Sequence, residues 1–67
     1  MTDIEQIQNM KDGETLYISQ GGGNGAEIVL KNGVYVLYEI ACCDDNSRYT
    51  DEFTDIYEMK KVYDSWT

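Results

Sequence analysis

The first hydrophobic pattern along the chain has a period of three to four residues and predicts a short amphipathic helix near the N-terminus. Thr2 and Glu5 have the spacing of a capping box at its start. Lys11 falls in the expected last turn, where a cation complements the helix dipole, and Gly13 is the expected residue after the helix. The apolar face of this helix consists of Ile4, Ile7 and Met10.

The next patterns alternate with a period of two and predict β-strands. Residues 14–19 form the first expected strand, with Leu16 and Ile18 on one face. The glycine-rich residues 20–25 follow as an expected flexible connection. Asn32-Gly33 then lies between two apolar runs, residues 26–31 and 34–42, which predicts a β-hairpin with a type I′ turn.

A two-residue turn fixes the hairpin register, so that Lys31 lies opposite Val34 and each side chain can be assigned to a face. One face carries Ile28, Leu30, Tyr35 and Leu37. The other carries Val29, Val34, Val36, Tyr38 and Ile40. Both faces are largely apolar, which is unusual for an antiparallel hairpin in so small a domain. We expect helices to cover one face, and a chain segment, a second copy or a partner to cover the other.

The C-terminal part predicts a polar turn at residues 44–47, a short edge strand at 48–53 and an amphipathic helix from about Thr54 to Trp66. In the edge strand Tyr49, Asp51 and Phe53 alternate with Arg48, Thr50 and Glu52. Thr54 is the expected N-cap of the helix. The apolar arc of this helix contains Ile56, Met59, Val62, Tyr63 and Trp66. The whole chain, residues 1–67, therefore predicts one α+β domain: a three-stranded antiparallel meander, or four-stranded with the edge strand, with the short N-terminal helix and the amphipathic C-terminal helix packed on one face.

The charge of the chain narrows the classes of partner. Thirteen acidic residues against five basic ones give a formal net charge of −8, and histidine is absent. A surface this negative repels nucleic acid and anionic membranes and attracts cationic partners. The plainer interpretation is that the charge keeps a small protein in solution. No segment approaches the length of a membrane helix and the N-terminus lacks a secretory signal pattern, so we expect a cytoplasmic protein.

Catalytic and cofactor chemistry has little support in the residues. Without histidine the usual Ser-His and Cys-His pairs cannot form, and nothing places a second carboxylate beside Glu39, so we expect no enzyme. The glycine-rich segment precedes a strand, whereas a phosphate loop precedes a helix, so we expect no nucleotide or other cofactor. Cys42 and Cys43 are adjacent and lack the spacing of zinc ligands, so we expect no metal and no structural disulfide.

An acidic stretch with tyrosines between its carboxylates supplies the candidate partner-binding residues. Carboxylates at a roughly phosphate-like spacing can occupy a cationic groove that otherwise binds nucleic acid, with tyrosines as contact residues. The alternative is an ordinary solvated acidic face. The candidate residues are Asp44, Asp45, Tyr49, Asp51, Glu52, Asp55, Tyr57 and Glu58.

Residues 33–40, Phe53 and residues 62–67 resemble short proteins carried by bacteriophages and mobile elements of Gram-positive bacteria. That class includes anti-CRISPR and other anti-defence inhibitors, many of them small and acidic, and some block the nucleic-acid groove of an effector nuclease. The resemblance implies a setting of this kind, and it assigns no functional residue.

Three functional hypotheses follow. The first is a protein–protein inhibitor or adaptor that engages a basic partner, such as a CRISPR effector or another nucleic-acid-binding protein, through the acidic residues. The second is a self-associating structural domain, a homodimer that uses the second face of the hairpin. The third is an enzyme or a metal-dependent protein with redox chemistry at Cys42 and Cys43.

Overall fold

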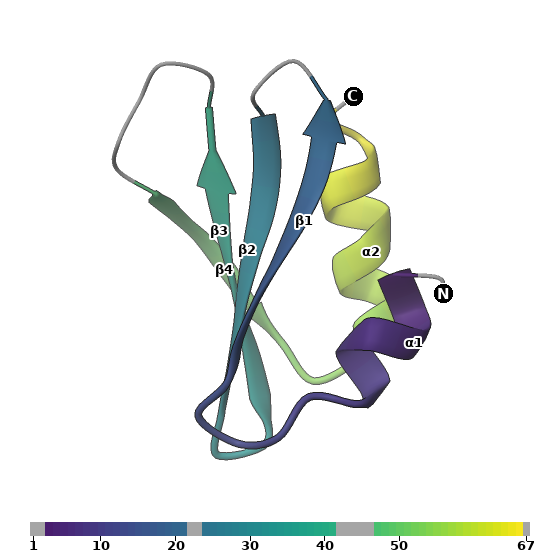
Figure 1. Cartoon of the computed structure of the whole chain (residues 1–67), viewed down its shortest axis with the longest axis vertical. Helices are drawn as coiled ribbons and strands as arrows, with labels where there is room; N and C mark the ends of the chain where they lie inside the picture. The colour runs from purple at the N-terminus through teal and green to yellow at the C-terminus, as the bar shows by residue number, and fades with distance from the viewer. Residues whose placement is uncertain (1–2, 22–23, 42–46, 67) are drawn as a thin grey trace.

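The computed structural model describes residues 3–21, 24–41 and 47–66, which form a four-stranded antiparallel sheet and two helices. The strands follow one another in the order β1-β2-β3-β4, and both helices lie on the same side of the sheet (Figure 1). This confirms the predicted α+β meander, including its fourth strand. None of the described helices is long and apolar enough to cross a membrane. The elements are α1 (Asp3–Gln8), β1 (Thr15–Gly21), β2 (Asn24–Lys31), β3 (Val34–Ile40), β4 (Arg48–Phe53) and α2 (Ile56–Asp64).

The central hairpin has the predicted turn and register. Asn32 and Gly33 both have positive φ angles, 53° and 80°, as a type I′ turn requires. Lys31 pairs with Val34, and the pairing continues without a shift to Gly25 and Ile40. The Asp12 carboxylate accepts a hydrogen bond from the Asn32 backbone N–H, which ties the α1–β1 connection to this turn. The register therefore fixes which hairpin side chains face the helices.

The core lies between the sheet and the two helices. Ile28 and Leu37 are fully buried, so their face of the hairpin is the one that meets the helices, a choice that the sequence left open. Ile7 from α1 and Met59 and Tyr63 from α2 are buried against them. The apolar periodicity predicted for both helices is thus confirmed. The partly buried residues that pack against this core are Met10, Leu16, Tyr35, Phe53, Ile56, Val62 and Trp66.

Helix α1 is shorter than predicted. It ends at Gln8, so Lys11 lies beyond its last turn. Gly13 does have a positive φ angle of 87°, but its N–H donates to the Leu30 carbonyl of β2, 2.7 Å away, and not to a helix carbonyl. The reason is that the connection between α1 and β1 pairs with the sheet before a further helical turn can form. Thr2, the predicted cap, lies outside the described residues.

Helix α2 starts one residue later than predicted, because Asp55 and not Thr54 is its N-cap. The Asp55 carboxylate accepts a hydrogen bond from the Tyr57 N–H at 2.9 Å, and the Asp55 backbone is extended, as an N-cap requires. A carboxylate also interacts with the positive end of the helix dipole, so it competes well against the neighbouring hydroxyl.

The glycine-rich segment is less of a loop than predicted. Strand β1 continues to Gly21 and β2 begins at Asn24, with a register irregularity between Ser19 and Gly21. Gly25 is a paired strand residue, and a Cβ there would lie 2.5 Å from Cε2 of the Tyr17 ring. Tyr17 therefore packs directly over the backbone of Gly25, on the side of the sheet away from the helices.

Strand β4 contains a β-bulge that sequence alternation did not predict. Leu37 pairs with Asp51 and Tyr38 pairs with Tyr49, so Thr50 is an extra residue without a partner in the ladder. Each side chain before the bulge is turned to the opposite face. The predicted alternation is therefore wrong at Tyr49, which shares its face with Glu52 and not with Asp51.

Candidate functional site

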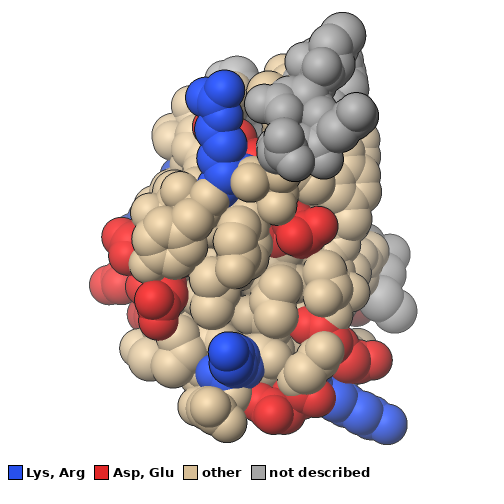
Figure 2. All heavy atoms as spheres, turned by 90° about the vertical axis from the view of Figure 1, so that its left-hand side faces the viewer, with Lys and Arg blue, Asp and Glu red and all other residues tan. Residues whose placement is uncertain are grey.

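The face of the sheet opposite the helices is open, and it carries the main candidate site. We call it the open face: the outward side chains of β2, β3 and β4 around Val36. Figure 2 shows this side of the molecule, with uncharged side chains through its middle and charged ones among and around them. An open depression of about 550 Å³ lies on it. Its lining consists of Val29, Lys31, Asn32, Val34, Val36, Tyr38, Tyr49 and Glu52.

The floor of the depression is apolar and only partly covered. Val29, Val34, Val36 and Tyr38 are each intermediate in burial, whereas Ile28, Leu30 and Leu37 on the opposite face of the hairpin are buried. Among the described residues no helix or loop lies over this floor (Figure 1). The second apolar face that the sequence predicted is therefore present and lacks a cover from the described part of the chain.

Tyr38, Tyr49 and Glu52 form one connected polar and aromatic group at the edge of the depression. The two tyrosine rings meet edge to face, with 6.2 Å between their centroids and 76° between their planes. The Tyr49 hydroxyl donates a hydrogen bond to Glu52 Oε2 at 3.1 Å. This hydrogen bond to a carboxylate raises the pKa of the Tyr49 phenol above its ordinary value, because it stabilises the protonated form. Tyr49 is nevertheless 59% exposed, so its ring is available to a ligand.

A second carboxylate lies beside the same aromatic pair. Tyr38 pairs with Glu27 of β2 on one side and with Tyr49 of β4 on the other. Directly opposite side chains on one face lie close together, so Tyr38 lies between Glu27 and Tyr49. The open face thus combines an apolar floor, two tyrosines and two carboxylates.

The predicted partner-binding residues fall into two groups. Tyr49 and Glu52 belong to the open face. Asp51 is turned to the other side of β4 by the register, and its carboxylate accepts a hydrogen bond from the Glu52 N–H at 2.8 Å.

The remaining candidates lie at the start of α2 or outside the described part of the chain. Asp55 is the N-cap, and Tyr57 and Glu58 are exposed in the first turn, with Tyr57 60% exposed. Asp44 and Asp45 lie outside the described residues. The role of all eight candidate residues in binding a partner stays a prediction.

Several residues of the open face were absent from the predicted site. Glu27 and Lys31 on β2 and Tyr38 on β3 belong to it through the hairpin register. The sequence did contain a signal for this face, because both faces of the hairpin are largely apolar. The predicted site was based instead on the run of acidic residues in the C-terminal part of the chain. The hairpin register already placed Tyr38 on this face, and the same register places Glu27 opposite Tyr38 and Lys31 opposite Val34.

The described part of the chain contains no group of residues that supports metal binding or acid–base catalysis. Within residues 3–21, 24–41 and 47–66, no cluster of three or more acidic or cysteine side chains could hold a metal ion. Glu39 pairs in register with Arg48 of β4, so its strand neighbour there is a cation and not a second carboxylate. Cys42 and Cys43, the candidates for redox chemistry, lie outside the described residues.

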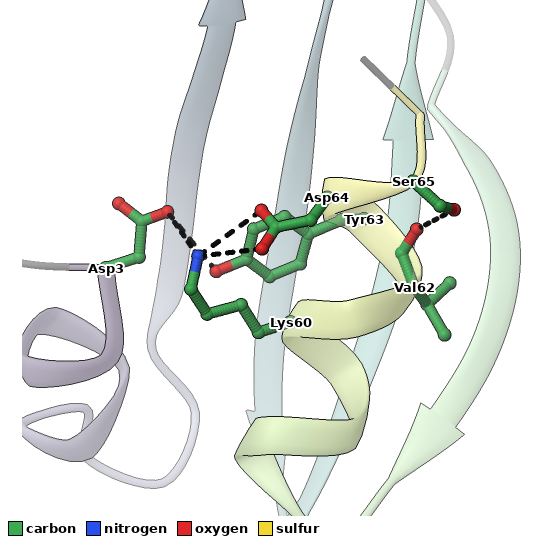
Figure 3. Close-up of polar contacts among 6 residues, drawn as sticks. All are labelled: Asp3, Lys60, Val62, Tyr63, Asp64 and Ser65. Carbon is green, nitrogen blue, oxygen red and sulfur yellow. Dashed lines mark hydrogen bonds and ion pairs between the residues drawn. The ribbon is translucent and has the colours of Figure 1, made fainter.

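A polar cluster on the other side of the molecule joins the two helices (Figure 3). Lys60 Nζ lies 3.0 Å from Asp64 Oδ2 and 3.8 Å from Asp3 Oδ2, and it also lies 5.4 Å from the Tyr63 ring centroid. The Tyr63 hydroxyl donates to Asp3 Oδ2 at 3.3 Å. Burial raises the pKa of Tyr63 well above its ordinary range, and the charges of Asp3 and Asp64 raise it further. Since this cluster connects α1 to α2, we assign it a structural role.

Comparison of the chain with protein-family models, with curated proteins and with solved structures finds no match.

Proposed function

We propose that this protein is a small acidic protein-binding module whose partner is a basic protein, and that it acts as an inhibitor by occupying a surface with which the partner binds nucleic acid. The observation that carries the proposal is the open face: an apolar floor with exposed tyrosine at its edge, on a chain of net charge −8.

The composition of the open face is that of a protein-binding surface. Interfaces have an apolar centre and a polar rim, and they are enriched in tyrosine. Here the half-buried Val36 lies between Val29 and the exposed Glu52 in the sheet register, so Val36 belongs to the centre and Glu52 to the rim. Exposed tyrosines also supply a large contact area with few rotatable bonds, which favours them as the residues that dominate binding energy.

The charge of the chain favours a basic partner over a neutral one. An excess of eight negative charges speeds association with a cationic surface and slows association with an acidic one. Basic surfaces on proteins commonly serve to bind phosphate groups of nucleic acid. A carboxylate-rich protein that covers such a surface competes with the nucleic acid for it, which is the inhibitory mode that the resemblance to phage and mobile-element proteins implies.

The test is capture of partners from a Gram-positive bacterial lysate by the tagged protein, across a series of salt concentrations and with added nucleic acid. We expect capture of a basic nucleic-acid-binding protein that is lost as salt or competitor rises. Capture of proteins that are not basic, or capture that neither salt nor nucleic acid weakens, would contradict the proposal.

A pair of matched variants separates location from net charge. Glu52→Lys raises the net charge from −8 to −6 at the open face. Gln8→Lys with Asn9→Lys makes the same change at exposed positions at the end of α1, on the helix side of the molecule. We expect the first to weaken capture clearly more than the second. Asp55 is left unchanged, because it caps α2 and its replacement would perturb the fold.

A further inference from the structure

We infer that the open face holds a recognition site for an arginine side chain of the partner, formed by Tyr38, Tyr49, Glu52 and Glu27. This inference rests on the proposed function and deepens it, because it names the chemical group that is bound and the residues that bind it.

The aromatic pair supplies two surfaces for a cation. Tyr38 and Tyr49 stand at 76° to each other with 6.2 Å between centroids, so a group placed over one ring lies beside the edge or the hydroxyl of the other. Aromatic faces attract cations, and a guanidinium group can stack flat on a ring because it is planar and weakly hydrated. The depression at this position is open enough to admit such a side chain.

The carboxylates make the site negatively charged. Glu52 uses Oε2 to accept the Tyr49 hydrogen bond, and its other oxygen, Oε1, takes no part in that bond. Glu27 lies beside Tyr38 on the opposite flank. A guanidinium group has five N–H donors, so it can stack on a tyrosine and donate to a carboxylate at the same time, whereas an ammonium group makes a point contact. The arrangement therefore favours arginine over lysine.

The lysine that lines the depression, Lys31, lies at the end farthest from Tyr49. Lys31 pairs with Val34 at the hairpin turn, four residues along β3 from Tyr38, which corresponds to about 13 Å along a strand. The depression consequently has a positive end at the turn and a negative, aromatic end at Tyr49. An extended segment of the partner that carries one arginine can therefore bind the depression in only one direction. Its arginine then lies at the Tyr49 end, and its apolar side chains lie over Val34 and Val36.

The charge also argues against a second copy of this chain as the occupant. Two copies that meet at their open faces bring together two chains of net charge −8, and on each open face the carboxylates Glu27 and Glu52 outnumber Lys31 among the described residues. Like charges in an interface are destabilising. A cationic partner relieves the same repulsion that a second copy increases.

The test uses the full chain and a blocked tripeptide Val-Arg-Val, with Val-Lys-Val and Val-citrulline-Val as matched peptides at constant ionic strength. Citrulline has the shape of arginine without its charge. Backbone amide shifts measured by NMR during titration give both the location and the dissociation constant. We expect saturable shifts around Val36, Tyr38 and Tyr49 with the arginine peptide, weaker ones with the lysine peptide, and the weakest with citrulline.

Two pairs of variants provide controls that the chain itself offers. Glu52→Gln and Glu58→Gln make the same change of charge at two exposed positions, and Tyr49→Ala and Tyr57→Ala remove two tyrosines of nearly equal exposure. We expect each open-face change to weaken binding of the arginine peptide about two- to fivefold, the range for an exposed cation–π contact or ion pair. Each α2 change should leave the affinity for this peptide unaltered, because Tyr57 and Glu58 lie outside the open face. Glu52→Gln keeps an acceptor for the Tyr49 hydroxyl, so it reports on charge even if Tyr49→Ala perturbs the strand.

Several outcomes would overturn the inference. These are equal binding of the citrulline and arginine peptides, shifts centred on the first turn of α2, no shift at the open face with millimolar peptide, or a dimer in sedimentation equilibrium that Val36→Asp dissociates. Failure of this site is distinguishable from failure of the proposed function. If a basic partner is captured in a salt-sensitive way and capture survives Glu52→Gln and Tyr49→Ala, the function stands and the arginine site is refuted.

Discussion

Replacement of Tyr63 by phenylalanine should change how the stability of the protein depends on alkaline pH. Tyr63 is buried, with only 1% of its surface exposed, and its hydroxyl donates to Asp3 Oδ2 at 3.3 Å. Tyr63→Phe removes one hydrogen bond to a partly exposed carboxylate and leaves the ring in place. We expect the variant to lose about 1 kcal/mol of stability at neutral pH, the usual contribution of one such bond.

The sign of the pH effect follows from the raised pKa of Tyr63. The unfolded chain ionises this tyrosine near pH 10, whereas the folded protein keeps it neutral, so the unfolded state binds fewer protons above that pH. The contribution of Tyr63 is therefore complete below about pH 10 and is lost as pH rises through the folded pKa. At about pH 11 the loss reaches about 1.4 kcal/mol, which exceeds the hydrogen bond that Tyr63→Phe removes. The variant should become the more stable protein above about pH 10.7.

The assay is urea unfolding followed by far-UV circular dichroism between neutral pH and about pH 11 for the wild type, Tyr63→Phe and Tyr57→Phe. Tyr57 is 60% exposed, so Tyr57→Phe is the matched control and should follow the wild-type curve at every pH. The comparison between variants cancels the titration of lysines and of the other tyrosines. Curves for the wild type and Tyr63→Phe that stay parallel through this range would refute the reasoning.

Three further predictions concern the N-cap of α2 and two glycines. Asp55→Ala should cost about 1 kcal/mol of stability in urea unfolding, because it removes the N-cap of α2, whereas Thr54→Ala should change stability by less than about 0.5 kcal/mol. An equal loss in both variants would contradict the assignment of the cap. Gly25→Ala should stay within about 1 kcal/mol of the wild type, since the exposed Tyr17 ring can rotate away from the new methyl group, but NMR contacts between Tyr17 and residue 25 should disappear. Gly33→Ala should cost about 1–2 kcal/mol because its φ angle is 80°, and a smaller loss than in Gly25→Ala would contradict this account.

The elements that the sequence predicted well are those with a strong local signal. Asn32-Gly33 has essentially one way to connect two strands, so the turn type and the whole β2–β3 register follow from it. The periodicity of α2 likewise identified Met59 and Tyr63 as core residues. In both cases the local preference and the burial of apolar surface favour the same conformation.

The predictions that failed depend on competition between partners distant in the sequence. Helix α1 ends early because the chain near Gly13 forms a hydrogen bond with Leu30 of β2, a residue seventeen positions away. Strands β1 and β2 extend into the glycine-rich segment because the sheet offers them hydrogen-bond partners, although glycine itself disfavours a strand. The N-cap of α2 was a choice between neighbouring Thr54 and Asp55, and only the hydrogen bond to Tyr57 decides it.

The candidate site depended on a single residue that no periodicity indicates. Phe53 pairs with Tyr35 and contributes to the core, so strict alternation would turn Asp51 and Tyr49 to the helix side as well. The bulge at Thr50 reverses this for Tyr49 and places it against Tyr38, where it also reaches Glu52. Bulges are common near functional positions because they re-aim a side chain without ending the strand. Here the bulge converts an acidic edge strand into one wall of an aromatic and acidic depression, and the residues that face a partner are therefore set by the β3–β4 pairing and not by the run of acids in the sequence.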